Sequence, residues 1–178
     1  MRNFLRIAAG IDTLPVLSAL AAMPDLWNEH TLRTAHPGTA HAAVDDIWIW
    51  FNDTSGDVVN DIQTHPSRAW REIPALRPMI LDLMRRVEGT QLGRVIITRL
   101  PPGKEITPHV DQGAPATFFT RFQIALQSFP GALFHAGNET VNFRCGEVWQ
   151  FNNQAEHSVV NNSADDRIVI IVDIRTAA

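Results

Sequence analysis

Hydrophobic and polar positions divide the chain into an early part that favours helices and a later part that favours strands. Residues 74–87 carry hydrophobic side chains at spacings of three and four, which predicts an amphipathic helix, and we expect Gly89 to end it. A second helix is predicted over residues 14–22, with Thr13 as its N-cap and Pro15 in its first turn. Both predicted helices precede most of the predicted strands.

The later part of the chain consists of short hydrophobic or alternating runs separated by turn residues, which is typical of strands. Strands are predicted over residues 4–9, 47–51, 95–100, 106–110, 118–127, 133–136, 139–143, 148–151, 157–160 and 167–174. So many short strands predict an antiparallel barrel or sandwich. The fold class is therefore α+β, with a double-stranded β-helix core (a cupin-like jelly roll) and the N-terminal helices packed on it.

Length and composition limit the partners of the protein. The chain has 178 residues, so we expect a single domain over residues 1–178. No hydrophobic run approaches the length of a membrane span. The formal net charge of −4 argues against nucleic acid or an anionic membrane as a partner. The single cysteine, Cys145, excludes an internal disulfide and fits a cytoplasmic location.

Two histidines and one aspartate form a candidate metal site. Two histidines and a carboxylate can occupy one face of an octahedral metal and leave three positions open. Side chains two apart in a strand point the same way, so His109 and Asp111 converge from one extended segment, and we expect His157 to come from a distant strand beside it. The alternative is a solvated His109–Asp111 pair with His157 as an ordinary core histidine.

A buried arginine is predicted close to this site. Arg167 lies ten residues after His157, beyond the polar turn at residues 161–166. We expect a hairpin at this turn to bring Arg167 next to His157, with a guanidinium suited to bidentate carboxylate binding. The following run, residues 168–172, is hydrophobic on both faces and should lie deep in the core.

Several segments resemble the aspartyl/asparaginyl β-hydroxylase family, whose members are Fe(II)- and 2-oxoglutarate-dependent dioxygenases. They are residues 121–126, 146–153, 157–159 and 166–173, and the resemblance covers about residues 90–175. The resemblance implies that dioxygen converts 2-oxoglutarate to succinate and carbon dioxide while an unactivated C–H bond is hydroxylated. The substrate class left open is a free amino acid or the side chain of a peptide or protein.

The resemblance also implies roles for individual residues. His109 and His157 match the metal ligands, and Arg167 matches the residue that holds the distal carboxylate of 2-oxoglutarate. Arg121 matches an arginine near the metal-chelating end of the co-substrate, and Gln123 stands where many members have a histidine.

The presence of Asp111 separates this chain from the animal aspartyl hydroxylases, which use two histidines only. The full triad resembles bacterial members instead, which include hydroxylases of free amino acids. Catalytic and metal-binding roles are therefore expected for all three residues of the triad. Asp111 also disfavours halogenation, because halogenases of this superfamily replace the carboxylate with halide.

The polar segment over residues 25–44 is expected to be a loop over the core. His41 and Arg33 are its candidates for substrate contact, although an ordinary surface loop explains the segment equally well. A metal cluster of His30, His36 and His41 is disfavoured because the region lacks strand periodicity.

Two other function classes remain open at this point. One is a non-enzymatic, cupin-like metal- or ligand-binding domain, against which the buried Arg167 argues, since such a charge needs an anionic partner. The other is a nucleic-acid-directed oxygenase that uses the same iron chemistry, which the acidic balance of the chain disfavours.

Overall fold

Two antiparallel β-sheets form the core of this computed structural model, which describes residues 2–177. The larger sheet has seven strands in the order β1 (Phe4–Ala8), β9 (Val148–Phe151), β6 (Thr120–Gln127), β11 (Arg167–Thr176), β4 (Gly89–Leu100), β2 (Asp45–Phe51) and β3 (His65–Pro66). The smaller sheet has four, in the order β5 (Glu105–His109), β10 (His157–Asn161), β7 (Ala132–Ala136) and β8 (Glu139–Val141). From β4 onward the chain passes repeatedly between the sheets, as in a jelly roll, so the predicted fold class is confirmed.

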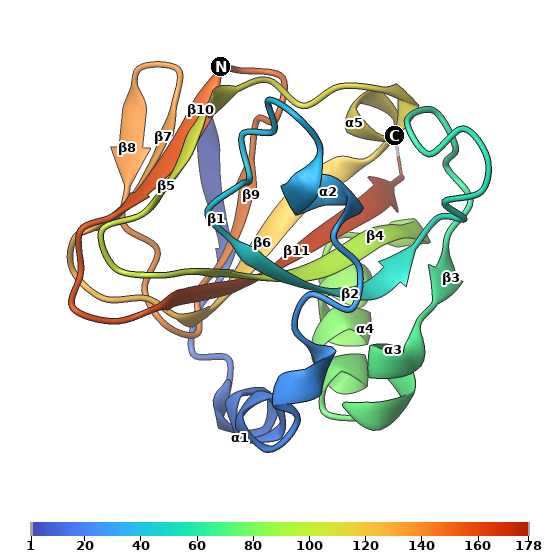
Figure 1. Ribbon diagram of the computed structural model, residues 1–178, viewed down its shortest axis with the longest axis horizontal. Coiled ribbons are helices and arrows are strands. Elements are labelled where there is room, and N and C mark those ends of the chain that lie inside the picture. The colour runs from blue at the N-terminus through green and yellow to red at the C-terminus, as the bar shows by residue number, and fades with distance from the viewer. Residues whose placement is uncertain (1, 178) are drawn as a thin grey trace.

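Helices α1, α3 and α4 pack on one face of the larger sheet, as predicted for the N-terminal helices (Figure 1). The helical elements are α1 (Leu14–Ala22), the 3₁₀ turn η1 (Pro24–Leu26), α2 (Leu32–Ala35), α3 (Arg68–Glu72), α4 (Leu76–Arg86) and α5 (Ala114–Phe118). The short elements η1, α2, α3 and α5 were not predicted, because they are too short to show a helical period. Of these, α2 lies within the segment that was expected to be a loop, residues 25–44. No helix among residues 2–177 is long and hydrophobic enough to cross a membrane.

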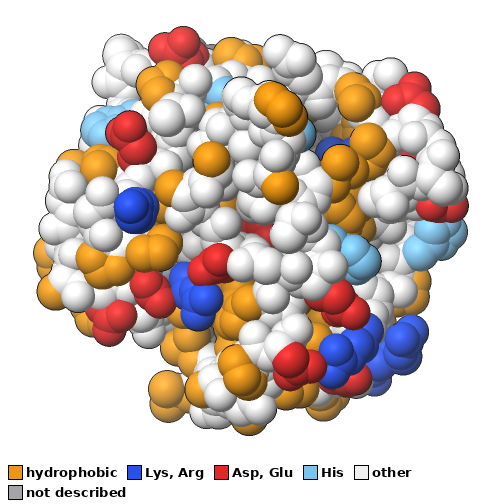
Figure 2. Space-filling model, viewed as in Figure 1, with side chains coloured by type: hydrophobic (Ala, Val, Ile, Leu, Met, Phe, Trp, Pro, Cys, Tyr) orange, Lys and Arg blue, Asp and Glu red, His pale blue; other side chains and the backbone are white. Residues whose placement is uncertain are grey.

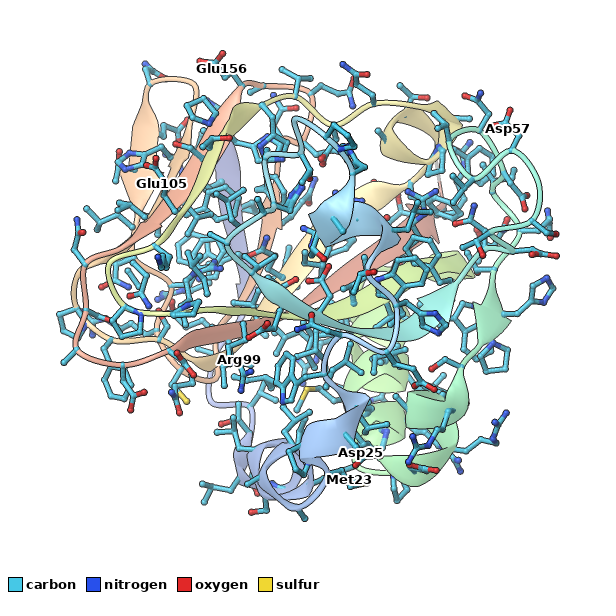
Figure 3. The ribbon with its side chains drawn as sticks, viewed as in Figure 1. Met23, Asp25, Asp57, Arg99, Glu105 and Glu156 are labelled. Carbon is cyan, nitrogen blue, oxygen red and sulfur yellow. The ribbon has the colours of Figure 1, made fainter. Side chains whose placement is uncertain are left out.

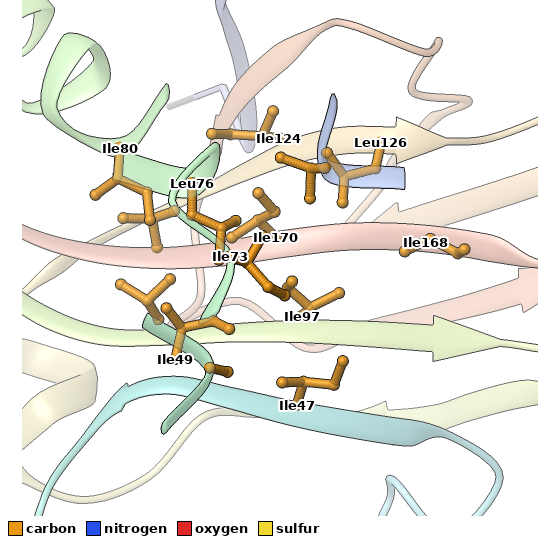
Figure 4. Close-up of a cluster of buried hydrophobic side chains, with 14 of the residues drawn as sticks. Ile47, Ile49, Ile73, Leu76, Ile80, Ile97, Ile124, Leu126, Ile168 and Ile170 are labelled. Carbon is orange, nitrogen blue, oxygen red and sulfur yellow. The ribbon is translucent and has the colours of Figure 1, made fainter. Parts of the chain in front are cut away.

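The main hydrophobic core lies between these helices and the outer face of the larger sheet. Alternate positions of β11, namely Ile168, Ile170, Val172 and Ile174, point into it together with Ile80 of α4 (Figure 4). Because β-strand side chains alternate between faces, the intervening residues of β11 point the other way, into the space between the two sheets. Helices α1, α3 and α4 therefore cover one face of the sheet and leave the other for the smaller sheet.

A second hydrophobic cluster fills part of the space between the sheets. It gathers aromatic side chains from both sheets, among them Phe4, Phe134, Phe143 and Phe151. Phe134 lies edge-on to Phe4, with ring centroids 5.2 Å apart. The polar residues on the inner faces of β6 and β11 lie beside this cluster, which places them in a largely dry environment.

Of two local predictions at helix ends, the one for Gly89 is wrong and the one for Thr13 is confirmed in position only. Gly89 does not end α4; Glu88 has the positive φ of 53°, and Gly89 begins β4, where a Cβ atom would lie 2.6 Å from Cγ2 of Ile174. Thr13 occupies the N-cap position of α1, as predicted, but its side chain does not cap the helix, because its hydroxyl lies 3.3 Å from Sγ of Cys145. Asp12 accepts the backbone N–H of Leu14 instead.

The hairpin predicted between His157 and Arg167 is also wrong. The strand β10 pairs with β5 and β7 in the smaller sheet, whereas β11 pairs with β4 and β6 in the larger one. The turn between them carries the chain from one sheet to the other, as a jelly roll requires. Arg167 consequently faces His157 across the space between the sheets rather than along one hairpin.

Candidate metal centre

Neighbouring strands of the smaller sheet bring the candidate ligands together. His109 ends β5 and lies opposite His157, the first residue of β10, with ring centroids 4.3 Å apart. Asp111 follows two residues after β5, where its backbone N–H donates to the carbonyl of Asn153 at 3.3 Å. Oδ1 of Asp111 lies 3.7 Å from Nε2 of His109 and 3.8 Å from Nε2 of His157. These three are the one group of potential metal-ligating residues within residues 2–177.

Backbone carbonyls fix the orientation of both imidazoles. Nδ1 of His109 lies 2.8 Å from the carbonyl of Thr107, and Nδ1 of His157 lies 2.9 Å from that of Ala155. A carbonyl can only accept, so each Nδ1 carries the proton and each Nε2 is left with a free lone pair. Burial lowers the pKa of His157, although Asp111 opposes this effect, and the imidazole is therefore neutral near pH 7.

Arg121 holds the carboxylate of the triad in place. Its NH1 donates to Oδ2 of Asp111 at 2.6 Å, while Nε and NH2 donate to the two oxygens of Asp173, both at 2.7 Å. Burial alone raises the pKa of Asp111, but Arg121 and the two histidines lower it by more, so that Asp111 is ionised. The arrangement leaves Oδ1 of Asp111 facing the imidazoles.

Asp173 was missed by sequence reasoning, although a signal was present. It is a single acidic residue within the hydrophobic run of β11, and its side chain is buried. A buried carboxylate in such a strand needs a cationic partner, and Arg121 is directly opposite it on β6.

Arg167 is fully enclosed and has no carboxylate partner within residues 2–177. It is 2% exposed, its NH2 donates to Oε1 of Gln123 at 3.0 Å, and its guanidinium lies 5.7 Å from the ring of Phe134 and 5.8 Å from that of Phe143. Burial lowers its pKa to about 10, so the side chain is still charged at neutral pH. The ring of Phe134 also lies 6.0 Å from that of His157, so Phe134 is close to both Arg167 and the triad.

The two residues predicted for substrate contact occupy different environments. The ring of His41 lies 4.7 Å from that of His109, and burial and the charge of Arg33 lower the pKa of His41. Arg33 donates to both oxygens of the buried Asp46, at 2.9 and 2.7 Å. His30 stacks on Trp48 and His36 is exposed, so the three histidines of this segment do not gather into a cluster.

The donor set suits a first-row transition metal. Two neutral imidazoles and one carboxylate, without a thiolate, match the facial arrangement found in non-haem Fe(II) oxygenases. The fixed Nδ1 protons and the Arg121 hydrogen bond pre-orient all three donors, which a metal site requires.

Comparison with known proteins bears on both the fold and the site. The sequence profile of the aspartyl/asparaginyl beta-hydroxylase family matches residues 21–177. No curated protein matches the chain.

Solved structures at low sequence identity share the fold. A prolyl hydroxylase from Trichoplax adhaerens, in complex with a hypoxia inducible factor peptide fragment, has a TM-score of 0.63 and 14% identity, over 98% of this chain and 84% of that one. A 2OG-Fe(II) oxygenase family oxidoreductase from Burkholderia pseudomallei has a TM-score of 0.56 and 16% identity, over 89% and 79%. A prolyl-4-hydroxylase from Pseudomonas putida has a TM-score of 0.56 and 12% identity, over 100% and 95%.

Proposed function

Because this chain belongs to the aspartyl/asparaginyl beta-hydroxylase family, we propose that His109, Asp111 and His157 bind Fe(II) and that Arg167 binds 2-oxoglutarate as the co-substrate. The chain is an oxygenase of the Fe(II)- and 2-oxoglutarate-dependent class and a hydroxylase. The observation that carries the proposed metal site is the convergence of two unprotonated Nε2 atoms and one carboxylate oxygen.

Bound iron and 2-oxoglutarate supply the oxidising chemistry, in which one atom of dioxygen enters succinate, the other enters the substrate as a hydroxyl group, and carbon dioxide is released. The protein holds the metal on one face, so that three positions stay open for other ligands. Arg121 keeps Asp111 ionised and correctly turned, and Asp173 keeps Arg121 in place. The backbone carbonyls that accept from Nδ1 of His109 and His157 fix both rings with Nε2 toward the metal position.

Arg167 has the properties of a carboxylate-binding residue. A buried guanidinium without an ionic partner is costly, and an incoming carboxylate removes that cost by forming charge-assisted hydrogen bonds. Phe134 and Phe143 keep water away from it, and Gln123 orients it through Oε1. We assign the distal carboxylate of 2-oxoglutarate to Arg167, and assign Gln123 and Arg121 to the same co-substrate site.

The substrate in this proposal is a free amino acid or the side chain of a peptide or protein. The contact between His41 and His109 supports a role for His41 at the substrate side, while Arg33, which is paired with Asp46, stays a prediction. The two sheets enclose one triad, which supports a single dioxygenase domain over residues 1–178. A cytoplasmic location and the absence of a nucleic-acid partner also stay predictions.

A thermal-shift titration tests the co-substrate assignment. With Zn(II) as a redox-inert metal, 2-oxoglutarate should stabilise the wild-type protein by about 2.7 kcal/mol at a hundredfold excess over Kd. Arg167→Lys should weaken 2-oxoglutarate binding by about 1–3 kcal/mol, and Arg167→Leu should abolish the shift without unfolding the protein.

Arg175→Leu is the matched control, because Arg175 also lies over an aromatic ring, that of Phe118 at 4.7 Å, but is exposed. It should keep the full shift. An equal shift in Arg167→Leu and wild type would show that Arg167 has only a structural role. Succinate release with Fe(II), across amino acids and short peptides, then identifies the substrate.

A further inference from the structure

A bulge in β4 places a second arginine, Arg94, opposite Asp173, the residue that binds Arg121 behind the triad. Val95 pairs with Val172 and Leu92 with Ile174, so two residues of β4, Gly93 and Arg94, lie opposite the single residue Asp173. Such a bulge redirects side chains, and bulges are common next to active sites. A Cβ atom on Gly93 would lie 3.0 Å from both Asp173 and the ring of Phe119, so Gly93 leaves no room for a side chain. Arg94 therefore provides the side chain at this bulge.

All observed partners of Arg94 are uncharged. Its Nε donates to Oδ1 of Asn52 at 2.9 Å, its NH2 donates to the carbonyl of Val58, and its guanidinium lies 4.7 Å over the ring of Phe51. No carboxylate within residues 2–177 lies within ion-pair distance of it. Asp57, in the same loop, points outward and binds Asn60 instead (Figure 3).

The acidic residues nearest to Arg94 are already engaged. Burial and Arg121 lower the pKa of Arg94, while Asp173 and Asp111 raise it, so all four groups share one electrostatic environment. Both aspartates, however, form their hydrogen bonds to Arg121. Arg94 is thus a half-buried positive charge that no carboxylate within the described residues neutralises.

If the charges in the proposed Fe(II)–2-oxoglutarate complex are added up, the positive charge of Arg94 is the one that is not neutralised. The charges of the metal, the co-substrate dianion, the two aspartates, Arg121 and Arg167 cancel. Arg33 is cancelled by Asp46 in the same way. The charge of Arg94 remains and would be neutralised by one anionic group of the substrate. A neutral substrate would leave the excess charge half-buried, which is unfavourable.

We propose that Arg94 binds a carboxylate group of the substrate and so sets the specificity of the enzyme. The inference rests on the proposed function and deepens it. The carboxylate belongs either to the α-carboxyl group of a free amino acid or to an Asp or Glu side chain within a peptide. Aromatic rings adjoin Arg94, because the ring of Phe51 beneath its guanidinium stacks on that of the buried Trp48 at 3.8 Å. Hydrophobic side chains with a basic one among them are visible in the upper right of Figure 2, between α2 and the loop after β2.

Matched pairs of probes, measured by thermal shift with Zn(II) and saturating 2-oxoglutarate, test the proposal. One pair is a pool of free L-amino acids and the pool of their amides. The other pair is N-acetylated, C-amidated Asp and Glu, with Asn and Gln in the same form. We expect a shift from one carboxylate-bearing pool and not from its neutral counterpart, and the responding pair identifies the source of the carboxylate. Equal shifts from acid and amide, or no shift from any carboxylate-bearing pool, would overturn the proposal.

Variants separate recognition of a carboxylate from support of the loop. Arg94→Gln keeps a hydrogen-bond donor for the loop but removes the charge, and it should weaken binding of the active pool at least tenfold. Arg94→Lys should weaken it less, because the charge remains. The 2-oxoglutarate shift, measured first, distinguishes failure of this proposal from failure of the proposed function.

Two controls complete the design. Asn52→Ala loosens the loop without removing Arg94, so it should retain the preference for acid over amide. Arg175→Gln should behave as wild type. If Asn52→Ala loses the preference as completely as Arg94→Gln does, Arg94 only anchors the loop and the proposal is wrong.

Discussion

The two faces of the larger sheet are both buried, yet only the inner face carries charged and polar side chains among its hydrophobic ones. The outer face, under α1, α3 and α4, presents hydrophobic residues throughout, such as Ile124 of β6 and Ile170 of β11. The inner face of the same two strands presents Arg121, Gln123, Arg167 and Asp173. Neighbouring positions in one strand thus serve stability and chemistry in turn.

This difference has an energetic basis. Burial of hydrophobic surface stabilises the outer face at about 25 cal/mol per Å². Buried charges on the inner face contribute little net stability even when they are paired, as Arg121 and Asp173 are. Arg167 and Arg94 have no ionic partner within the described residues, so the inner face is suited to bind anions rather than to stabilise the fold. Substitutions on the two faces should therefore affect different properties.

The largest expected effect comes from the triad. His109→Ala, Asp111→Ala and His157→Ala should each reduce 2-oxoglutarate-dependent succinate release to background and weaken Fe(II) binding, because each removes one of three donors. The melting temperature of the metal-free protein should change little. Iron stoichiometry, succinate release and thermal unfolding measure the three properties. Retention of both iron and turnover in any variant would remove that residue from the site.

The outer face should respond in the opposite way. Ile170 is completely buried in the main core, so Ile170→Ala should lower the free energy of unfolding by about 2–5 kcal/mol, which denaturant titration measures. Leu81 of α4 is 56% exposed, and Leu81→Ala is the control, with a change of about 0.5 kcal/mol or less. Below the unfolding transition, Ile170→Ala should retain iron binding. A specific loss of iron binding without loss of stability would contradict the division between the faces.

Asp173→Asn tests the support of the triad. The substitution keeps the shape of the side chain but weakens the hold on Arg121, which in turn positions Asp111. Loss of such a supporting contact typically reduces metal affinity or activity by about 10- to 100-fold, which is less than the effect of removing a ligand. Fe(II) titration measures this change. Unchanged affinity would show that Arg121 positions Asp111 without help from Asp173.

The alternation of hydrophobic and polar positions was sufficient to predict the strands and much of the fold. The two-residue period of β6 puts Phe122 and Ile124 on one face and Arg121 and Gln123 on the other, and Phe122 and Ile124 lie in the main hydrophobic core. Period does not report which strands become neighbours, because sheet pairing is decided by contacts far apart in the sequence. The expected hairpin before Arg167 was wrong for this reason.

The remaining parts of the site depend on pairing between distant charges. Residues 109–111, 157 and 167 could be recognised from residue type and spacing, and the resemblance supplied the role of Arg167 in 2-oxoglutarate binding. The sequence contains several acidic residues and arginines that could pair. Without the register of the strands, it does not show that Arg121 pairs with Asp173 or that Arg33 pairs with Asp46. The position of Arg94 depends on a bulge, which one extra residue in one strand creates and which no periodic pattern specifies.

The smallest expected effect concerns a carboxylate that lies away from the triad. Glu147 precedes β9 and is 6% exposed. It accepts hydrogen bonds at 2.9–3.0 Å from the backbone N–H of Arg144, the indole of Trp149 and the guanidinium of Arg6. Burial alone raises the pKa of Glu147, but these hydrogen bonds lower it by more, so it lies below its ordinary value.

Glu147→Gln should lower stability without affecting catalysis, in contrast to Asp111→Asn. A carboxyl group whose pKa is lower in the folded than in the unfolded protein stabilises the fold above its unfolded pKa, about 4.3, and this contribution is lost as the pH falls through the folded value. Wild type should therefore exceed Glu147→Gln in stability by about 1–2 kcal/mol at pH 7, and the difference should shrink as the pH falls below about 4. Denaturant unfolding across this pH range measures the difference, and succinate release at pH 7 measures activity. If Glu147→Gln lost as much activity as Asp111→Asn, the charge of Glu147 would also serve the chemistry, and the proposed separation between structural and functional charges would fail.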